Sequence, residues 1–172
     1  MKKQNILKWI ILGVAIIINV FILVNACIEG GASAQESGRV ARFFANIINF
    51  FAHDAINSSN FDSFAYVIRK LIGHFGLFAV DGVVSTYAIH LFTKETKFKY
   101  VYFTIGGSLI FGLLIASVSE IIQIFTPDRY GSWGDIGIDF AGYFLGTGLI
   151  ILILFLNKQV KFAKDKNIED LS

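Results

Sequence analysis

Four long apolar stretches, separated by polar segments, set the pattern of this chain. They run from about residue 6 to 24, 67 to 92, 100 to 125 and 136 to 156. Each is close to the roughly 20 residues that a helix needs to cross about 30 Å of hydrocarbon, and none alternates as a barrel strand does. The pattern predicts an all-α integral membrane protein, a four-transmembrane-helix bundle in a single domain that covers residues 1–172.

The segment from 28 to 66 carries a second helical pattern. Apolar side chains recur there at three- and four-residue spacing, at Val40, Phe43, Phe44, Ile47, Ile48 and Phe51. A helix of this kind is too short and too polar to span a membrane, but its aromatic face can lie against acyl chains at the interface. We expect an extracellular amphipathic interfacial helix between spans one and two. A helix packed against its own bundle is the alternative.

Lysine and arginine near the span ends predict the orientation, because positive flanks are retained in the cytoplasm. Lysines precede span one, fill the connection between spans two and three, and follow span four. Both termini are therefore expected to be cytoplasmic, with the segments 28–66 and 126–135 outside. Arg69, Lys70 and Arg129 break this bias, which favours a functional role for them. The net charge of +2 argues against nucleic-acid binding.

Cys27 is the only cysteine, so an internal disulfide and a cysteine-based metal site are excluded. The residues before it loosely resemble a lipoprotein cleavage site, and cleavage there would leave three spans. The apolar run is longer than the 7 to 15 residues or so of a typical signal core. We therefore expect span one to be retained.

Polar residues gather at the helix ends on one side of the predicted bilayer. Charge at membrane depth costs roughly 2.5 to 3.5 kcal/mol per residue, so such a group suggests a site. Small residues follow these ends along the same faces and allow close helix contact. We expect one pocket near the outer surface, formed by Lys70, His74, Glu120, Gln123, Arg129, Asp135 and Asp139.

Asp81 lies on the same predicted face as His74, but about 16 Å further from the surface than Lys70 at 1.5 Å per residue. We expect Asp81 to point inward and to be neutral or paired. A serine or tyrosine from span three or four is its expected partner.

The residue types suggest two kinds of chemistry. An imidazole beside carboxylates suits general acid–base work, and the candidate catalytic residues are His74, Glu120, Asp135 and Asp139. Cations and amides suit a phosphate or carboxylate, and the candidate ligand-binding residues are Lys70, Gln123, Arg129 and Ser132. No Gly-x-Ser-x-Gly motif surrounds a serine nucleophile. A divalent metal held by the histidine and the acids is an alternative, but no two-histidine spacing is present, so we expect no metal and no cofactor.

Three motifs together resemble the VanZ-like membrane proteins, a family named after a teicoplanin-resistance protein. Lys70-x-x-x-His74 is similar to the first element of the family, and Glu120-x-x-Gln123 with Arg129 is similar to the second. Ser132-x-x-Asp135, followed by Asp139, Gly142 and Gly146, is similar to the third, although the family usually has asparagine at the position of Asp139 and often tyrosine at that of Phe78. The resemblance covers roughly residues 66 to 150. It implies a multi-pass bacterial membrane protein linked to lipoglycopeptide resistance.

Three interpretations of the polar residues remain open. The protein could bind an anionic or lipid-linked envelope ligand, such as a cell-wall precursor or the lipoglycopeptide itself, at the outer leaflet among membrane lipids. It could instead be a membrane-embedded acid–base hydrolase or transferase that acts on a lipid or acylated envelope substrate. Finally, the charges could neutralise one another and serve only to fix helix register.

Overall fold

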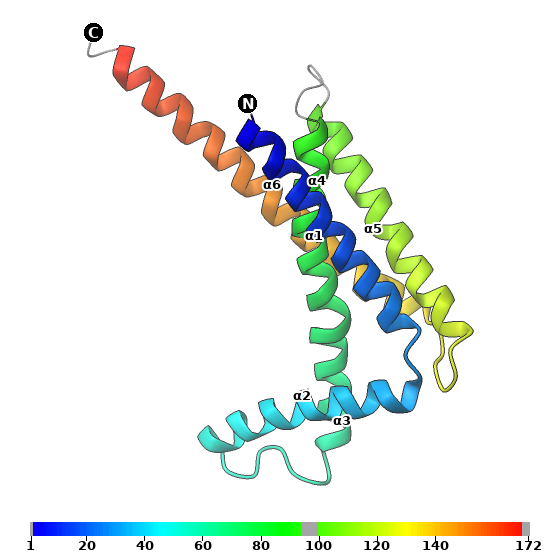
Figure 1. The fold of residues 1–172 in the computed structure, drawn as a ribbon. Helices are drawn as coiled ribbons and strands as arrows, with labels where there is room; N and C mark the ends of the chain where they lie inside the picture. The colour runs from blue at the N-terminus through cyan, green and yellow to red at the C-terminus, as the bar shows by residue number, and fades with distance from the viewer. Residues whose placement is uncertain (1, 94–99, 170–172) are drawn as a thin grey trace.

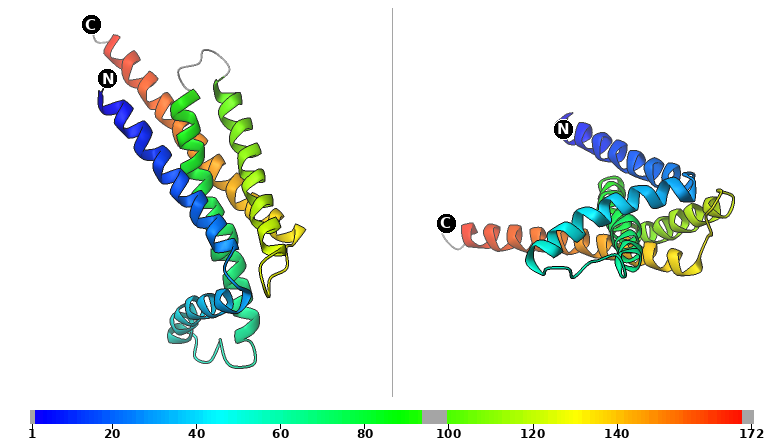
Figure 2. Two further views of the ribbon diagram at one scale, coloured as in Figure 1. Left: turned by 45° about the vertical axis from the view of Figure 1, so that its right-hand side comes forward. Right: turned by 90° about the horizontal axis from the view of Figure 1, so that it is seen from below.

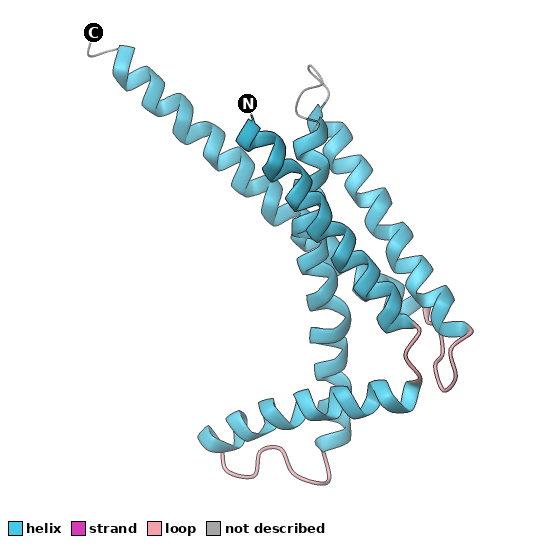
Figure 3. Cartoon of the chain, in the orientation of Figure 1, coloured by secondary structure: helices cyan, strands magenta, loops and turns pink. Residues whose placement is uncertain are grey.

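The computed structural model describes residues 2–93 and 100–169, and these residues are helical apart from short connections (Figure 3). In chain order the elements are α1 (Lys2–Ala26), α2 (Gly30–Phe51), α3 (Phe61–Ile68), η1 (Arg69–Gly76), α4 (Leu77–Thr93), α5 (Tyr100–Ile124) and α6 (Trp133–Glu169). Four helices in the described residues are long and apolar enough to cross a membrane, namely Asn5–Ala26, Phe61–Thr93, Tyr102–Ile124 and Trp133–Gln159. The predicted all-helical membrane fold is confirmed.

The second membrane helix is longer than expected because α3, η1 and α4 follow one another without a break over 33 residues. At 1.5 Å per residue this rod is about 50 Å long, well beyond a hydrocarbon layer of about 30 Å. The other three long helices pack around its upper part, with both chain termini at the same end (Figure 1). The lysine-rich connection at 94–99 lies outside the described residues.

The helix α2 lies at the opposite end from the termini and crosses the rod instead of running along it (Figures 1 and 2). It contacts α3 and η1. Several of its aromatic side chains are exposed, and Phe43 is in contact with Phe44. The predicted helix therefore exists, while its position in an extracellular membrane interface remains a prediction.

The outside of the bundle is apolar, while its interior combines an apolar cluster around Phe78 and Tyr143 with many polar groups. Large apolar side chains face outward along the long helices, and Ile17, near the middle of α1, is 68% exposed. The polar groups of the interior include hydroxyl groups: Thr86 contacts Ser108, and its hydroxyl lies 2.9 Å from that of Thr147. Such a distribution is typical of helices in lipid, where polar contacts and small residues hold the helices together.

Glycines in α4 and α6 bring the backbones of these helices into direct contact. A Cβ atom on Gly142 would overlap the main chain of Phe75, and one on Gly146 would overlap that of Ala79. Likewise, a Cβ on Gly82 would overlap the main chain of Tyr143. Close approach is therefore built into the α4–α6 contact, which positions the polar residues at the start of α6 against η1.

The segment η1 is a π-helix, so the α-helical spacing assumed for Lys70 and His74 is wrong in this segment. The N–H of Leu77 donates to the carbonyl of Ile72, five residues earlier, and to that of His74, three residues earlier. Segments of π-helix are rare and frequently occur at functional sites. Here the π-helix carries two of the polar residues that the sequence singles out.

Asp81 points inward and is paired, as expected, but its expected partner is wrong. One carboxylate oxygen accepts hydrogen bonds from the amide of Asn19 at 2.9 Å and from the hydroxyl of Ser85 at 2.6 Å. The partners therefore come from α1 and from the same helix, not from span three or four. The packing of α1 against α4 decides this pairing, and Tyr143 contacts Ser108 instead.

Candidate functional site

Two parallel contacts join η1 to the first turns of α6. Lys70 forms an ion pair with Asp135, and Nδ1 of His74 lies 3.0 Å from Oδ1 of Asp139. Asp135 and Asp139 lie four positions apart in α6, and Lys70 and His74 both face them from the π-helix η1, so the two contacts lie one above the other. Both contacts form because Gly142 and Gly146 let α6 approach η1 and α4 closely.

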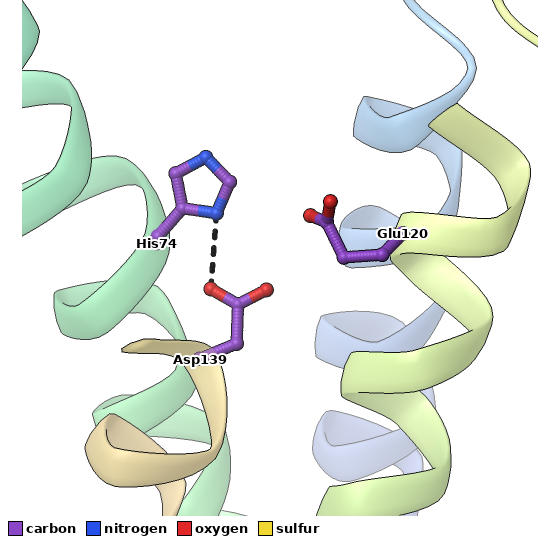
Figure 4. Close-up of side chains that lie close together, drawn as sticks. All are labelled: His74, Glu120 and Asp139. Carbon is purple, nitrogen blue, oxygen red and sulfur yellow. Dashed lines mark hydrogen bonds and ion pairs between the residues drawn. The ribbon is translucent and has the colours of Figure 1, made fainter. Parts of the chain in front are cut away.

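Glu120 lies near the end of α5 and is 2% exposed. Its two carboxylate oxygens accept hydrogen bonds, one from the side-chain amide of Gln123 at 2.7 Å and one from the main-chain N–H of Ser132 at 2.9 Å. The residue is therefore held from its own helix and from the turn that leads into α6. This places its carboxylate opposite the pair formed by His74 and Asp139 (Figure 4).

The connection between α5 and α6 folds back over this carboxylate. Arg129 donates one hydrogen bond to Oε1 of Gln123 at 3.1 Å and another to the carbonyl of Asn25 at 3.3 Å. The carbonyl of Pro127 accepts a hydrogen bond from the N–H of Gly30 at 3.0 Å. These contacts fix the connection against the end of α1 and the start of α2, and with it the position of the guanidinium.

Arg129 is 9% exposed, and no Asp or Glu lies within ion-pair distance of it in the described part of the chain. Its Nε is buried and makes no hydrogen bond. Burial lowers the pKa of Arg129, nearby Arg69 lowers it further, and Glu120 partly opposes this. An arginine still remains charged at neutral pH. The site therefore contains a buried cation whose charge is not directly paired.

Two cavities adjoin this arginine. The inner cavity, of about 100 Å³, reaches His74, Asp139 and Ser119. The outer cavity, of about 230 Å³, reaches Lys70 and Asp135. Both cavities are lined by Arg69, Gln123 and Arg129.

The structure brings the seven predicted polar residues into one region around these cavities. Ser132 lines neither cavity, because its hydroxyl accepts a hydrogen bond from the N–H of Gly134 at 3.1 Å at the start of α6. Its main-chain N–H, not its hydroxyl, contacts Glu120. The chemical roles of these residues stay predictions.

Arg69 lines both cavities but was not among the predicted site residues, although its position outside had favoured a functional role for it. The signal in the sequence is its positive charge on the predicted outer side, where lysine and arginine are less common. Ser33 and Ser37 in α2 also line the inner cavity, four residues apart on one helical face. The sequence did not predict that these two serines line a cavity, because it does not show where α2 packs.

The arrangement supports three kinds of chemistry. Arg69 and Arg129 line both small cavities and can hold an anion there. Acids also line them, Glu36 and Asp139 the inner cavity and Asp128 and Asp135 the outer cavity. An imidazole oriented by a carboxylate can exchange protons with a bound molecule. A histidine and two carboxylates can also hold a metal ion, and the close group formed by His74, Glu120 and Asp139 provides these ligands.

Comparison with known families agrees with this picture. No curated protein and no solved structure matches the chain. The family model described as VanZ/LLP1 matches residues 9–155, which include the four membrane helices for most of their length and every residue around the two cavities. Because that match covers most of the sequence, this multi-pass helical membrane protein belongs to the VanZ/LLP1 family.

Proposed function

We propose that the protein binds the anionic head group of a lipid-linked envelope molecule at the outer leaflet of the bacterial membrane and thereby contributes to teicoplanin resistance. The observation that carries this proposal is Arg129, a buried cation without a direct acidic partner beside two cavities. An unpaired buried charge is costly, and an anionic ligand in the cavities removes that cost. Arg69 adds a second positive charge to both cavities.

The sizes of the cavities favour a head group over the whole drug. Pockets for drug-sized molecules typically measure about 300 to 1,000 Å³. The cavities here measure about 100 and 230 Å³, which suits a phosphate or pyrophosphate. The lipid tail would remain in the bilayer against the exposed apolar side chains of the helices.

The proposed orientation follows from the flanking lysines, which place both termini in the cytoplasm. Residues of α2 line the inner cavity, and α2 crosses the rod at the end opposite the termini (Figure 1). In this orientation α2 lies on the outer surface with its exposed aromatic side chains toward the lipid. The cavities then open where cell-wall precursors are exposed.

A second function is supported by the contact between His74 and Asp139. A carboxylate on one ring nitrogen orients an imidazole, as in many acid–base catalysts, and leaves the other nitrogen for a proton transfer. The hydroxyl of Ser119 lines the same cavity but donates to the carbonyl of Ala116 at 2.9 Å. A hydrolase or transferase of this type would therefore activate water or a substrate hydroxyl.

The binding proposal predicts a specific response to anionic lipid. The purified full chain in phosphatidylcholine nanodiscs should gain thermal stability when phosphatidylglycerol replaces part of the lipid, because ligands that bind only the folded state stabilise it. Soluble pyrophosphate should give the same gain if the head group alone is recognised, and none if the lipid is required. Equal melting temperatures in all three conditions would contradict anion binding.

Glu120→Gln separates the interpretations, because it keeps the shape of the side chain but removes its charge and its proton exchange. Under the binding proposal, teicoplanin resistance in a susceptible host should fall only in part. If the site catalyses acid–base chemistry, resistance should vanish while the protein still inserts and expresses. If the charges are purely structural, the melting temperature in detergent should fall in step with resistance. Measuring both quantities in the same variant distinguishes these outcomes.

A further inference from the structure

We propose that His74, Glu120 and Asp139 form a binding site for a divalent transition-metal ion such as Zn²⁺ or Mn²⁺. The residues come from η1, α5 and α6, and one potential ligand atom from each lies within 4.8 Å of the others. All three side chains are buried. The proposal goes beyond anion binding and does not depend on it, because it concerns a cation bound by other side chains than Arg129 and Arg69.

The strongest sign of a missing cation is Asp139, which is 1% exposed. Its Oδ1 contacts His74, while its Oδ2 is buried and has no hydrogen-bond partner. Figure 4 shows the second oxygen directed toward Glu120, into the space between the three side chains. A buried carboxylate oxygen without a partner is costly, and a metal ion at this position would satisfy it.

Lysine and arginine do not supply the missing charge. Lys70 pairs with Asp135, and Arg129 donates to Gln123 and Asn25. Within the described residues, no lysine or arginine lies within ion-pair distance of Glu120 or Asp139. Two buried acids therefore lie beside an imidazole, with no lysine or arginine paired to either of them.

The surrounding contacts also suit a metal site. Ligating carboxylates in proteins are usually held by further hydrogen bonds, which fix their orientation. Glu120 accepts such bonds from Gln123 and from the N–H of Ser132, and each of its oxygens retains a second lone pair. The inner cavity touches His74 and Asp139, so a water or an anion can reach a fourth coordination position.

Only a small adjustment is needed to close the site. Metal–ligand distances of about 2.1 Å place ligand atoms about 3.4 Å apart in a tetrahedron. The potential ligand atoms lie within 4.8 Å of one another, so the three groups have to close in by up to about 1.4 Å, and Nδ1 of His74 exchanges its contact with Oδ1 of Asp139 for the metal. One imidazole with two carboxylates favours Zn²⁺ or Mn²⁺ over Mg²⁺ and Ca²⁺, which prefer oxygen ligands only. A metal held by the histidine and the acids was the sequence-based alternative to no metal, and the proposed site takes its three ligands from three separate helices, without Asp135.

The test measures metal binding by the full chain in detergent, without a histidine tag. The protein is stripped with EDTA, equilibrated with ZnCl₂ or MnCl₂, and its metal content is measured by mass spectrometry after gel filtration. We expect a single equivalent bound by the wild type. His74→Ala and the isosteric Asp139→Asn should each lose affinity by roughly 100-fold or more, and Gln123→Ala by roughly 10- to 100-fold.

His53→Ala is the matched control, because His53 is a histidine whose side chain is 93% exposed and lines neither cavity. It should bind metal as the wild type does. Metal binding is measured in detergent without anionic lipid or pyrophosphate, so failure of the anion proposal and failure of this one are distinguishable. An absence of stoichiometric metal in the wild type, or unchanged binding in folded Asp139→Asn, would overturn the proposal.

Discussion

Replacing Arg129 with alanine is expected to abolish the stabilisation by anionic lipid and to remove most of the protection against teicoplanin. Hydrogen bonds to charged groups contribute about 1.5 to 3 kcal/mol each, so anion affinity should fall roughly tenfold to a hundredfold. The anion affinity of Arg129→Lys should lie between those of the wild type and Arg129→Ala, because a lysine keeps the charge but lacks the planar fork of donors. Thermal stability in nanodiscs with and without phosphatidylglycerol measures the first effect, and growth at graded teicoplanin concentrations measures the second.

Arg39→Ala provides the control for this experiment. Arg39 is an exposed arginine on α2 that lines neither cavity, so the substitution removes the same charge from the protein without touching the site. It should behave as the wild type in both measurements. Equal loss in Arg39→Ala and Arg129→Ala would mean that general positive charge attracts the lipid, and the proposed pocket would be wrong.

Gly142→Ala adds only one methyl group, but we expect it to destabilise the bundle strongly. The added Cβ would overlap the main chain of Phe75, and backbone cannot move aside as a flexible side chain can. Overpacking typically costs about 1 to 3 kcal/mol, so the melting temperature in detergent should fall clearly. Separation of α6 from η1 should also weaken the contacts of Lys70 and His74 with the two aspartates, and with them the metal affinity.

Gly148→Ala gives a matched comparison six residues further along α6. A Cβ on Gly148 meets nothing within 4 Å, so the substitution should be neutral or slightly stabilising, by about 0.5 to 1 kcal/mol from helix propensity. Similar melting temperatures for the two variants would show that the tight α6 contact is absent in the membrane.

Part of the candidate site follows from local sequence. The spacing of Asp135 and Asp139 puts both acids on one face of α6, and Glu120 and Gln123 share one turn of α5. Such short-range relations depend only on helical periodicity. The contact between Asp81 and Asn19 did not follow, because Asn19 lies 62 residues away and the contact depends on how α1 packs against α4. The contact with Ser85, four residues further along the same helix, does fit helical spacing. The π-helix at Lys70 and His74 could not be predicted either, because no simple sequence repeat indicates one.

The sequence by itself determined the class of the protein, the four membrane helices and the set of polar residues. Long apolar runs and costly buried charges are properties of the chain in lipid, whatever its tertiary arrangement. Only the tertiary structure decided which charges pair. It joined Lys70 to Asp135, left Arg129 without an acid, and directed Asp139 toward Glu120. These outcomes depend on contacts between separate helices, because an ion pair forms only where packing brings two particular side chains within a few ångströms.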